Sequence, residues 1–396
     1  MTNILSGIRV LDFGRYIAGP YAATILANFG AEVIRIEKLN GSEDRFITPL
    51  TEDQSGDGGI FMQMSQNKKG ITLNPMKPEG REVVERLVKT ADIVVANLPV
   101  ETLQAMGLDY DSLKAMKQDV ILVHGSAFGD VGPYKNRVGF DGLGQAMSGA
   151  MYLSGDENGP RKLFGPWVDY STALLSALGA MAALRHRDQT GEGQLVTTSL
   201  FGSSLLISAV ALIEQAMLGI NRVGTGNRGQ NAGPSDTFQT KDGWVLVQAL
   251  GGPLFERWAE LMGEDHWLSD PRFATDQLRG DNNHLLSERM AKWCIERTTE
   301  EALAEMEAIR LPCGPVLSPQ QVLEDPHFAA MEMLTMTRYP GFDKEVPVVE
   351  MPIKMSKTDT RMKRRAPTLG EHTDEVMQSL GYSAAEIEEL RKKRVV

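Results

Sequence analysis

The first 125 residues alternate short apolar runs with helix-forming segments, and this alternation constrains the fold more than any other feature of the chain. Residues 8–13 and 31–37 have the apolar character of buried strands. Between them, Pro20 is placed to open a helix over 21–29, and Gly30 is placed to end it. A strand, a short helix and a strand in close succession form a βαβ unit, whose two strands are parallel.

The same pattern recurs further along the chain. Residues 78–90 and 102–117 predict helices, and each is followed by a short apolar strand, at 92–96 and 120–124. Repeated βαβ units predict an α/β fold, with a Rossmann-like, doubly wound parallel sheet in a large domain. Residues 173–184 are rich in Ala, Leu and Met and predict a closely packed core helix.

A second, smaller α+β domain is expected downstream. Residues 238–248 predict a β-hairpin with Lys-Asp-Gly at its tip, and helices follow near 254–262 and 285–309. The apolar stretch 203–220 is interrupted by Glu214 and Gln215, which favours a buried helix over a membrane span. The expected parts are a large domain at 1–200, a linker helix and Gly-rich loop at 201–235, a small domain at 236–325, and a return linker and C-terminal part packing on the large domain at 326–396.

Composition excludes several function classes. The net charge of -11 disfavours nucleic acid as a partner, because proteins that bind it carry a basic face. The two cysteines form no CxxC pair and the N-terminus has no signal-peptide pattern, so we expect a cytoplasmic protein without disulfides or a membrane anchor. The six histidines show no HxH or HxxxH spacing, so no metal site is expected.

Motifs for common cofactors and nucleophiles are absent or misplaced in the sequence. Residues 224–229 match GxGxxG, but they follow a long apolar stretch and precede a loop, whereas a dinucleotide site needs this motif between a strand and a helix. The first strand-to-helix turn, at 14–19, lacks the motif. The chain has no GxSxG or Walker A sequence, which disfavours serine hydrolases and P-loop enzymes.

Asp169 is the residue that stands out as a candidate for chemistry. It lies just before a predicted helix over 170–184, and a short strand is expected over 162–168. Aspartate is a favoured N-cap residue, so a purely structural role is one interpretation. A desolvated carboxylate at a helix start can also act as a nucleophile. Local spacing does not separate the two.

Several segments resemble the class III CoA-transferases, which are also called the CaiB/BaiF family. The segments occur in the family's order along nearly the whole chain, and they resemble the formyl-CoA transferases of that family. The longest runs from GIRVLDFGRYIAGPY through AEVIRIEKLNGSEDR, at residues 7–45. Others are NKKGITL at 67–73, FGDVGPY at 128–134, GFDGLGQAMSG at 139–149, TGEGQ at 190–194, TKDGW at 240–244 and APTLGEHT at 366–373.

The resemblance implies an enzyme that moves coenzyme A from an acyl-CoA to a free carboxylic acid, with CoA as a substrate and no permanently bound cofactor. It also implies an interlocked homodimer, and Asp169 as a nucleophile that forms anhydride and aspartyl-CoA intermediates. Two alternatives stay open: an α-methylacyl-CoA racemase of the same fold, or a non-catalytic acyl-CoA-binding protein. The family's racemases carry Gly-His-Asp where this chain has Phe140 between Gly139 and Asp141, which disfavours proton relay.

The resemblance also suggests binding residues. An acyl pocket is expected from Arg15, Trp167 and Tyr134, together with Tyr16 and Ile17 of the first turn. Ile17 replaces a glutamine of formyl-CoA transferases, which puts the oxalate–formate pair in doubt, and the run after Asn97 departs from the family's Asn-Phe-Arg-Pro-Gly. Candidate CoA contacts are Tyr16, Ile17, Lys38, Lys68, Lys69, Asn97, Lys135 and Arg137, and the covering loop at 226–234 contributes Gly229, Gln230 and Gly233.

Overall fold

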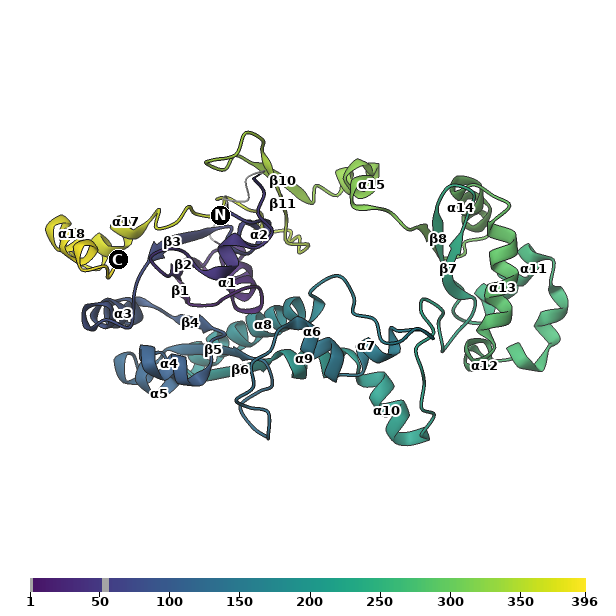
Figure 1. Cartoon of the computed structure of the whole chain (residues 1–396), viewed down its shortest axis with the longest axis horizontal. Helices are drawn as coiled ribbons and strands as arrows, with labels where there is room; N and C mark the ends of the chain where they lie inside the picture. The colour runs from purple at the N-terminus through teal and green to yellow at the C-terminus, as the bar shows by residue number, and fades with distance from the viewer. Residues whose placement is uncertain (1–2, 52–56) are drawn as a thin grey trace. The chain divides into compact units, whose positions relative to one another are not determined.

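The computed structural model describes residues 3–51 and 57–396. The chain divides into two compact units. The large unit contains Met1–Ser148, Phe164–Ile213 and Ala330–Val396, and the small unit contains Gly149–Leu163 and Glu214–Ala329 (Figure 1). Each unit has its own hydrophobic core.

A six-stranded parallel sheet forms the centre of the large unit and confirms the predicted α/β fold. The strand order is β3-β2-β1-β4-β5-β6. The order reverses direction between β1 and β4, and in such sheets the ligand crevice lies beyond the carboxyl ends of the strands at this reversal. The strands are β1 Arg9–Asp12, β2 Glu32–Glu37, β3 Lys68–Thr72, β4 Ile93–Ala96, β5 Ile121–Ser126 and β6 Leu195–Ser199.

Helices cover both faces of this sheet (Figure 1). One core layer joins the sheet to α3 Pro78–Thr90 and to the C-terminal helices α17 Thr373–Ser379 and α18 Ala384–Lys392. The opposite layer joins it to α1 Ala18–Asn28 and α8 Trp167–Thr190. Shorter elements of this unit are η1 Glu43–Phe46, α2 Gly59–Met64, α4 Val100–Met106, α5 Tyr110–Met116, α6 Asp141–Met147, β10 Leu334–Thr337 and β11 Val346–Val349.

Two local predictions in the large unit are wrong for identifiable reasons. The single helix expected over 102–117 is divided into α4 and α5, because Gly107 adopts a left-handed φ of 69° and Asp109 caps a new helix through the Ser112 N–H. The strand expected over 162–168 does not form, and α8 begins at Trp167 instead.

The apolar stretch at 203–220 is also not the single buried helix that we predicted. It forms α9 Leu200–Ile207 and α10 Ala209–Leu218, which meet at an angle of 65°. Val210 and Met217 expose 80% and 76% of their surface, and no residue of α10 is buried. The helix α8 has the length and apolarity of a membrane span, but it packs against α1 and the sheet as a core helix.

The small unit combines a three-stranded sheet with a helical layer around Trp258, which is fully buried. The predicted hairpin is present as β7 Ser235–Gln239 and β8 Trp244–Gln248. Segment 149–163, which we placed in the large domain, groups with this unit, where the Gly226 N–H donates to the Gly155 carbonyl at 2.8 Å. Its other elements are α7 Ala150–Leu153, α11 Gly252–Met262, η2 Asp265–Ser269, η3 Pro271–Phe273, α12 Asp276–Asp281, α13 Asn283–Cys294, α14 Thr299–Ala308, β9 Cys313–Pro315, α15 Pro319–Glu324 and α16 Pro326–Ala330.

Candidate active site

A cavity of about 1070 Å³ lies in the large unit, where the segments that follow β1, β2, β3, β4 and β5 converge. This is the edge of the sheet at which the reversed strand order places a ligand. One wall is the first turn of α8. Of the residues suggested by the sequence, the cavity wall contains Arg15, Tyr16, Lys38, Asn97, Lys135, Arg137 and Asp169.

Asp169 is the third residue of α8, and it is not the N-cap residue. Pro166 occupies the cap position and makes no side-chain cap hydrogen bond. Burial and, to a smaller extent, the nearby negative charge of Asp141 together raise the pKa of the Asp169 carboxyl to about 7. A carboxyl group that is half ionised near neutral pH and faces a large cavity is well suited to act as a nucleophile or a base.

Asp141, which the sequence analysis cited only in the comparison with racemases, caps α8 in place of a local residue. Its Oδ2 accepts hydrogen bonds from the Val168 N–H at 2.8 Å and the Asp169 N–H at 3.2 Å. Its Oδ1 accepts a bond from Gln145 Nε2 at 2.5 Å. Asp141 thus sets both the position of Asp169 and the charge beside it. Asp141 is the first residue of α6, and its partner Val168 lies 27 residues away in the sequence, so no local pattern pairs them.

The turn after β1 is held in an uncommon conformation by Asn97. The Asn97 side chain accepts from the Arg15 N–H at 2.6 Å and donates to the Arg15 carbonyl at 2.8 Å. The next residue, Tyr16, has a φ of 62°, which a non-glycine residue adopts only under constraint. Its ring contacts Phe140 edge-on, with centroids 5.0 Å apart. Asn97 therefore positions the turn, in addition to lining the cavity.

Lys68 is buried beneath this turn, and the prediction that it contacts CoA is wrong. Its side chain has no exposed surface, and its Nζ donates to Asp12 Oδ2 at 2.8 Å and to the Pro20 carbonyl at 2.6 Å. Burial alone would raise the pKa of Asp12, but the adjacent Lys68 and Arg35 charges lower it. Lys69 is likewise outside the cavity wall, where it pairs with Glu32 and Glu375 at 2.7 Å each.

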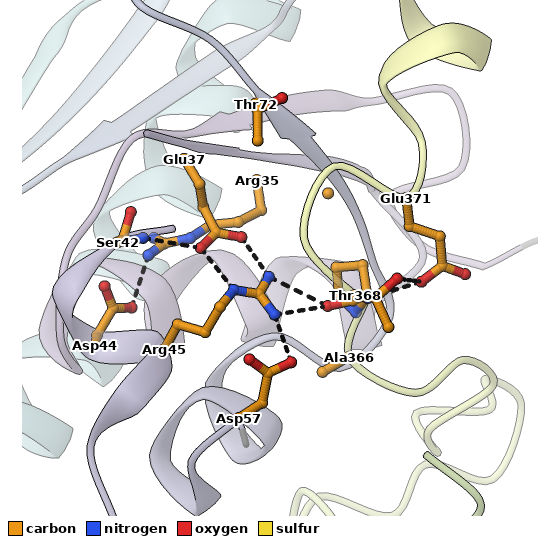
Figure 2. Close-up of polar contacts among 12 residues, drawn as sticks. Arg35, Glu37, Ser42, Asp44, Arg45, Asp57, Thr72, Ala366, Thr368 and Glu371 are labelled. Carbon is orange, nitrogen blue, oxygen red and sulfur yellow. Dashed lines mark hydrogen bonds and ion pairs between the residues drawn. The ribbon is translucent and has the colours of Figure 1, made fainter. Parts of the chain in front are cut away.

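A second buried ion pair fixes the loop after β2. Arg45 Nη2 lies 2.6 Å from Glu37 Oε2, and Arg45 Nη1 lies 2.7 Å from Asp57 Oδ2 (Figure 2). The guanidinium also donates to the Pro367 carbonyl at 3.3 Å and stacks over the Phe61 ring at 3.7 Å. Because Glu37 and Arg45 bracket residues 38–44, this pair holds the part of the cavity wall that carries Lys38.

The remaining suggested residues have distinct locations. Ile17 is buried at the start of α1 and does not line the cavity, and Trp167 packs against Ala18 and Val168. The Arg137 guanidinium stacks on the Tyr134 ring at 4.1 Å. The loop residues Gly229, Gln230 and Gly233 belong to the small unit, where the Gly229 N–H donates to the Ser235 carbonyl at 2.7 Å.

Comparisons with known proteins agree with this geometry. Residues 5–373 match CoA-transferase family III. The chain belongs to this family. It is 32% identical to the succinyl-CoA–D-citramalate CoA-transferase of Chloroflexus aurantiacus, over 99% of this chain and 98% of that protein. It is also 32% identical to the formyl-CoA:oxalate CoA-transferase of Rhodopseudomonas palustris, over 98% and 96%.

A solved structure supports the fold assignment. The chain superimposes on a CaiB/BaiF family protein from Brucella suis with a TM-score of 0.84 and 31% identity, covering 96% of this chain and 100% of that one. Family III CoA-transferases use CoA thioesters as substrates. Asp169 is a half-buried carboxyl group of raised pKa in the cavity wall.

Replacing Asp169 with asparagine is predicted to stabilise the CoA-transferase at alkaline pH. The folded-state pKa of about 7 lies above the ordinary aspartate pKa of 3.8, so ionisation of this group costs stability as pH rises through that interval. Asp169→Asn removes the cost. We expect its free energy of unfolding to equal that of the wild type near pH 4 and to exceed it by roughly 2 kcal/mol at pH 8, about half the full linkage value because the side chain retains contact with solvent. Urea unfolding at both pH values measures this, and an unchanged difference would contradict the assigned pKa.

Asp141 provides a separate test of how α8 is held. Asp141→Ala leaves the Val168 and Asp169 N–H groups without their acceptor, which is predicted to lower the free energy of unfolding by about 1–3 kcal/mol. Asp141→Asn keeps an oxygen acceptor and is expected to lose less than half of that amount. Equal losses in the two variants, measured by urea unfolding at pH 7, would show that capping is not the role of this side chain.

Proposed function

We propose that this CoA-transferase works by covalent relay through Asp169. A carboxylate oxygen attacks the donor thioester carbonyl, so that a C–O bond forms, the C–S bond breaks and CoA leaves as the thiolate. The thiolate then attacks the aspartyl carbonyl and releases the donor acid, which leaves an aspartyl-CoA thioester. The acceptor carboxylate attacks that thioester, and the released thiolate attacks the new anhydride at the acceptor carbonyl. Acyl-CoA of the acceptor forms and Asp169 is free again.

The observation that carries this proposal is the half-buried Asp169 carboxyl in the wall of a CoA-sized cavity, with a pKa of about 7. Desolvation makes a carboxylate more nucleophilic, and it also keeps water from anhydride and thioester intermediates. A cavity of about 1070 Å³ is large enough for an extended CoA thioester. From the resemblance to the family, we also propose that the loop with Gly229, Gln230 and Gly233 covers the reacting atoms.

The racemase alternative is disfavoured by the residue before Asp141. Racemisation needs two acid–base groups, one on each face of the α-carbon. The family's racemases carry histidine where this chain has Phe140, which lines the cavity and packs edge to face with Tyr16, and a phenyl ring cannot exchange a proton. His124 also lines the cavity, but its Nε2 is hydrogen-bonded to the Leu98 carbonyl at 2.9 Å. A non-catalytic acyl-CoA-binding role would leave the raised pKa of Asp169 without use.

For the substrates, we infer short dicarboxylic acids and their CoA thioesters. Relatives with 32% identity are named for succinyl-CoA as donor, with citramalate or mesaconate as acceptor. Lys135 and Arg137 line the cavity on the segment after β5, where they could pair with a second carboxylate. Ile17 is buried behind the turn in place of a glutamine, which disfavours the oxalate–formate pair. We place the enzyme in the cytoplasm, because both cysteines are free.

Incubation with succinyl-CoA in the absence of acceptor tests the relay. We expect mass spectrometry to find a CoA or succinyl adduct on the peptide with Asp169, and hydroxylamine to convert it to a hydroxamate. The pH dependence of adduct formation should follow ionisation with a midpoint near 7, and Asp141→Asn should move that midpoint to lower pH because a negative charge is removed.

Asp169→Ala is the decisive variant, with an expected loss of transfer rate of roughly a thousandfold or more. Asp188→Asn is the matched control, because Asp188 is an exposed aspartate in the last turn of the same helix. Failure to find an adduct with any thioester of a panel, together with solvent deuterium at the substrate α-carbon, would contradict the transferase mechanism and favour the racemase.

The exposed apolar residues of α9 and α10 support the homodimer that we infer from family resemblance. Leu206, Ile207, Val210 and Met217 expose more than half of their surface in the isolated chain, an arrangement that a partner subunit would cover. Light scattering is expected to give twice the chain mass of 43.5 kDa. Val210→Glu is predicted to weaken the dimer at least tenfold, because a charge would be buried, whereas Val210→Ala should not. A stable wild-type monomer would overturn the inference.

A further inference from the structure

Arg394, near the C-terminal end of the sequence, lines the same cavity as the turn after β1 near the N-terminal end. It follows α18, and the two residues after it, Val395 and Val396, are buried in the core of the large unit. The Val395 N–H donates to the Leu390 carbonyl at 2.9 Å, and the Val395 carbonyl accepts from the Asn74 N–H at 2.7 Å. The segment is therefore fastened to the loop after β3, and Arg394 becomes part of the cavity wall.

The backbone of Arg394 has an uncommon conformation, and its side chain lines the cavity. Its φ is 55°, in the left-handed region that residues other than glycine, asparagine and aspartate rarely adopt. Burial of Val395 on one side and the end of α18 on the other hold it there. Such strain recurs at functional sites, where the surrounding structure over-determines the conformation. The Arg394 side chain is exposed toward the cavity.

Arg394 has no carboxylate partner within the described part of the chain, whereas two nearby lysines have one. Lys38 is paired with Glu43, and Lys393 lies 3.3 Å from Glu79. Lys77, which also lines the cavity, donates to the Lys393 carbonyl, so its ammonium group lies beside the backbone that leads into Arg394. Lys77 and Arg394 are thus two cations on the wall of the same cavity.

Beside Arg394 the cavity wall includes the loop after β3, because Asn74 and Lys77 of that loop bond to the backbone on either side of Arg394. Asp169 lies on a different element of the wall, α8. Lys68 and Lys69 do not line the cavity. Other cations are therefore needed to pair with the phosphates of a CoA ligand. Glu101 is the carboxylate of α4 on this wall, in the first turn of that helix.

We propose that Arg394 binds a phosphate group of the nucleotide part of CoA, an inference that rests on the proposed function. A guanidinium offers two parallel N–H donors to phosphate oxygens, and Lys77 adds a point charge beside it. Arg394 is then a binding residue that sets affinity for the nucleotide and takes no part in the chemistry at Asp169. The C-terminal segment thus contributes Arg394 to a cavity whose wall comes mainly from the loops that follow the N-terminal strands.

Binding of adenosine 3′,5′-bisphosphate to the full chain, measured by calorimetry in about 0.1 M salt, tests this directly. We expect Arg394→Gln to raise the Kd by roughly tenfold to a hundredfold, the range of a lost charge-assisted hydrogen-bond pair. Arg394→Gly should do the same while keeping the fold, because glycine adopts a positive φ without strain. Arg391→Gln is the matched control, since Arg391 is an α18 arginine that pairs with Asp374 and lies outside the cavity wall.

Transfer assays separate a nucleotide contact from a structural defect. With succinyl-CoA as donor, Arg394→Gln should raise KM by the same factor as Kd and leave kcat unchanged. With the succinyl thioester of pantetheine, which lacks the nucleotide, variant and wild type should behave alike. Equal nucleotide binding by Arg394→Gln and the wild type, or an equal loss with both thioesters, would overturn the proposal. A wild type that binds the bisphosphate in an Arg394-dependent way but transfers no CoA would refute the proposed function and leave this inference standing.

Discussion

The buried ion pair between Asp12 and Lys68 is the constraint on which the active site depends. Asp12 ends β1, Lys68 begins β3, and Arg35 of β2 lies between them with its Nη1 3.4 Å from Asp12 Oδ1. Three adjacent parallel strands are thereby joined by charge as well as by backbone hydrogen bonds. Removing one partner would leave an uncompensated charge in the core, which costs far more than a surface ion pair. The pair therefore stabilises these three strands only while both charges are present.

The same buried charges also hold the turn that lines the cavity. Asp12 Oδ1 accepts from the Gly14 N–H at 2.9 Å, Lys68 donates to the Pro20 carbonyl, and Arg35 donates to the Gly14 carbonyl. Both ends of the turn are thus bound to buried charges. Asn97 of the next strand then sets the centre of the turn at Arg15. A conformation with Tyr16 at positive φ persists because four strands contribute to holding it.

The fold was predictable because it follows from local, repeated signals, whereas much of the site was not. Apolar runs, helix starts and glycine stops recur in order, so the parallel sheet and the helices on its faces could be inferred from the sequence. Lys68 was suggested as a CoA contact by resemblance, and its burial could not be foreseen because it depends on its partner Asp12, which lies two strands away across the sheet. Asp141 and Arg394 act through contacts with distant segments, and no local pattern distinguishes them from surface charges. The exposed face of α10 was missed because apolar composition alone does not show what covers it.

The proposed role of Asp169 as a nucleophile depends on contacts with distant segments. Burial raises its basicity, and basicity and nucleophilicity rise together, but burial also favours the protonated form that cannot attack. A pKa of about 7 balances these effects, because a substantial fraction stays ionised at neutral pH while the anion is far more reactive than an ordinary aspartate. The buried charge of Asp141 contributes to that balance through space, and its hydrogen bonds to the first turn of α8 hold Asp169 in place at the same time. Asp141 thus acts on both the position and the pKa of Asp169.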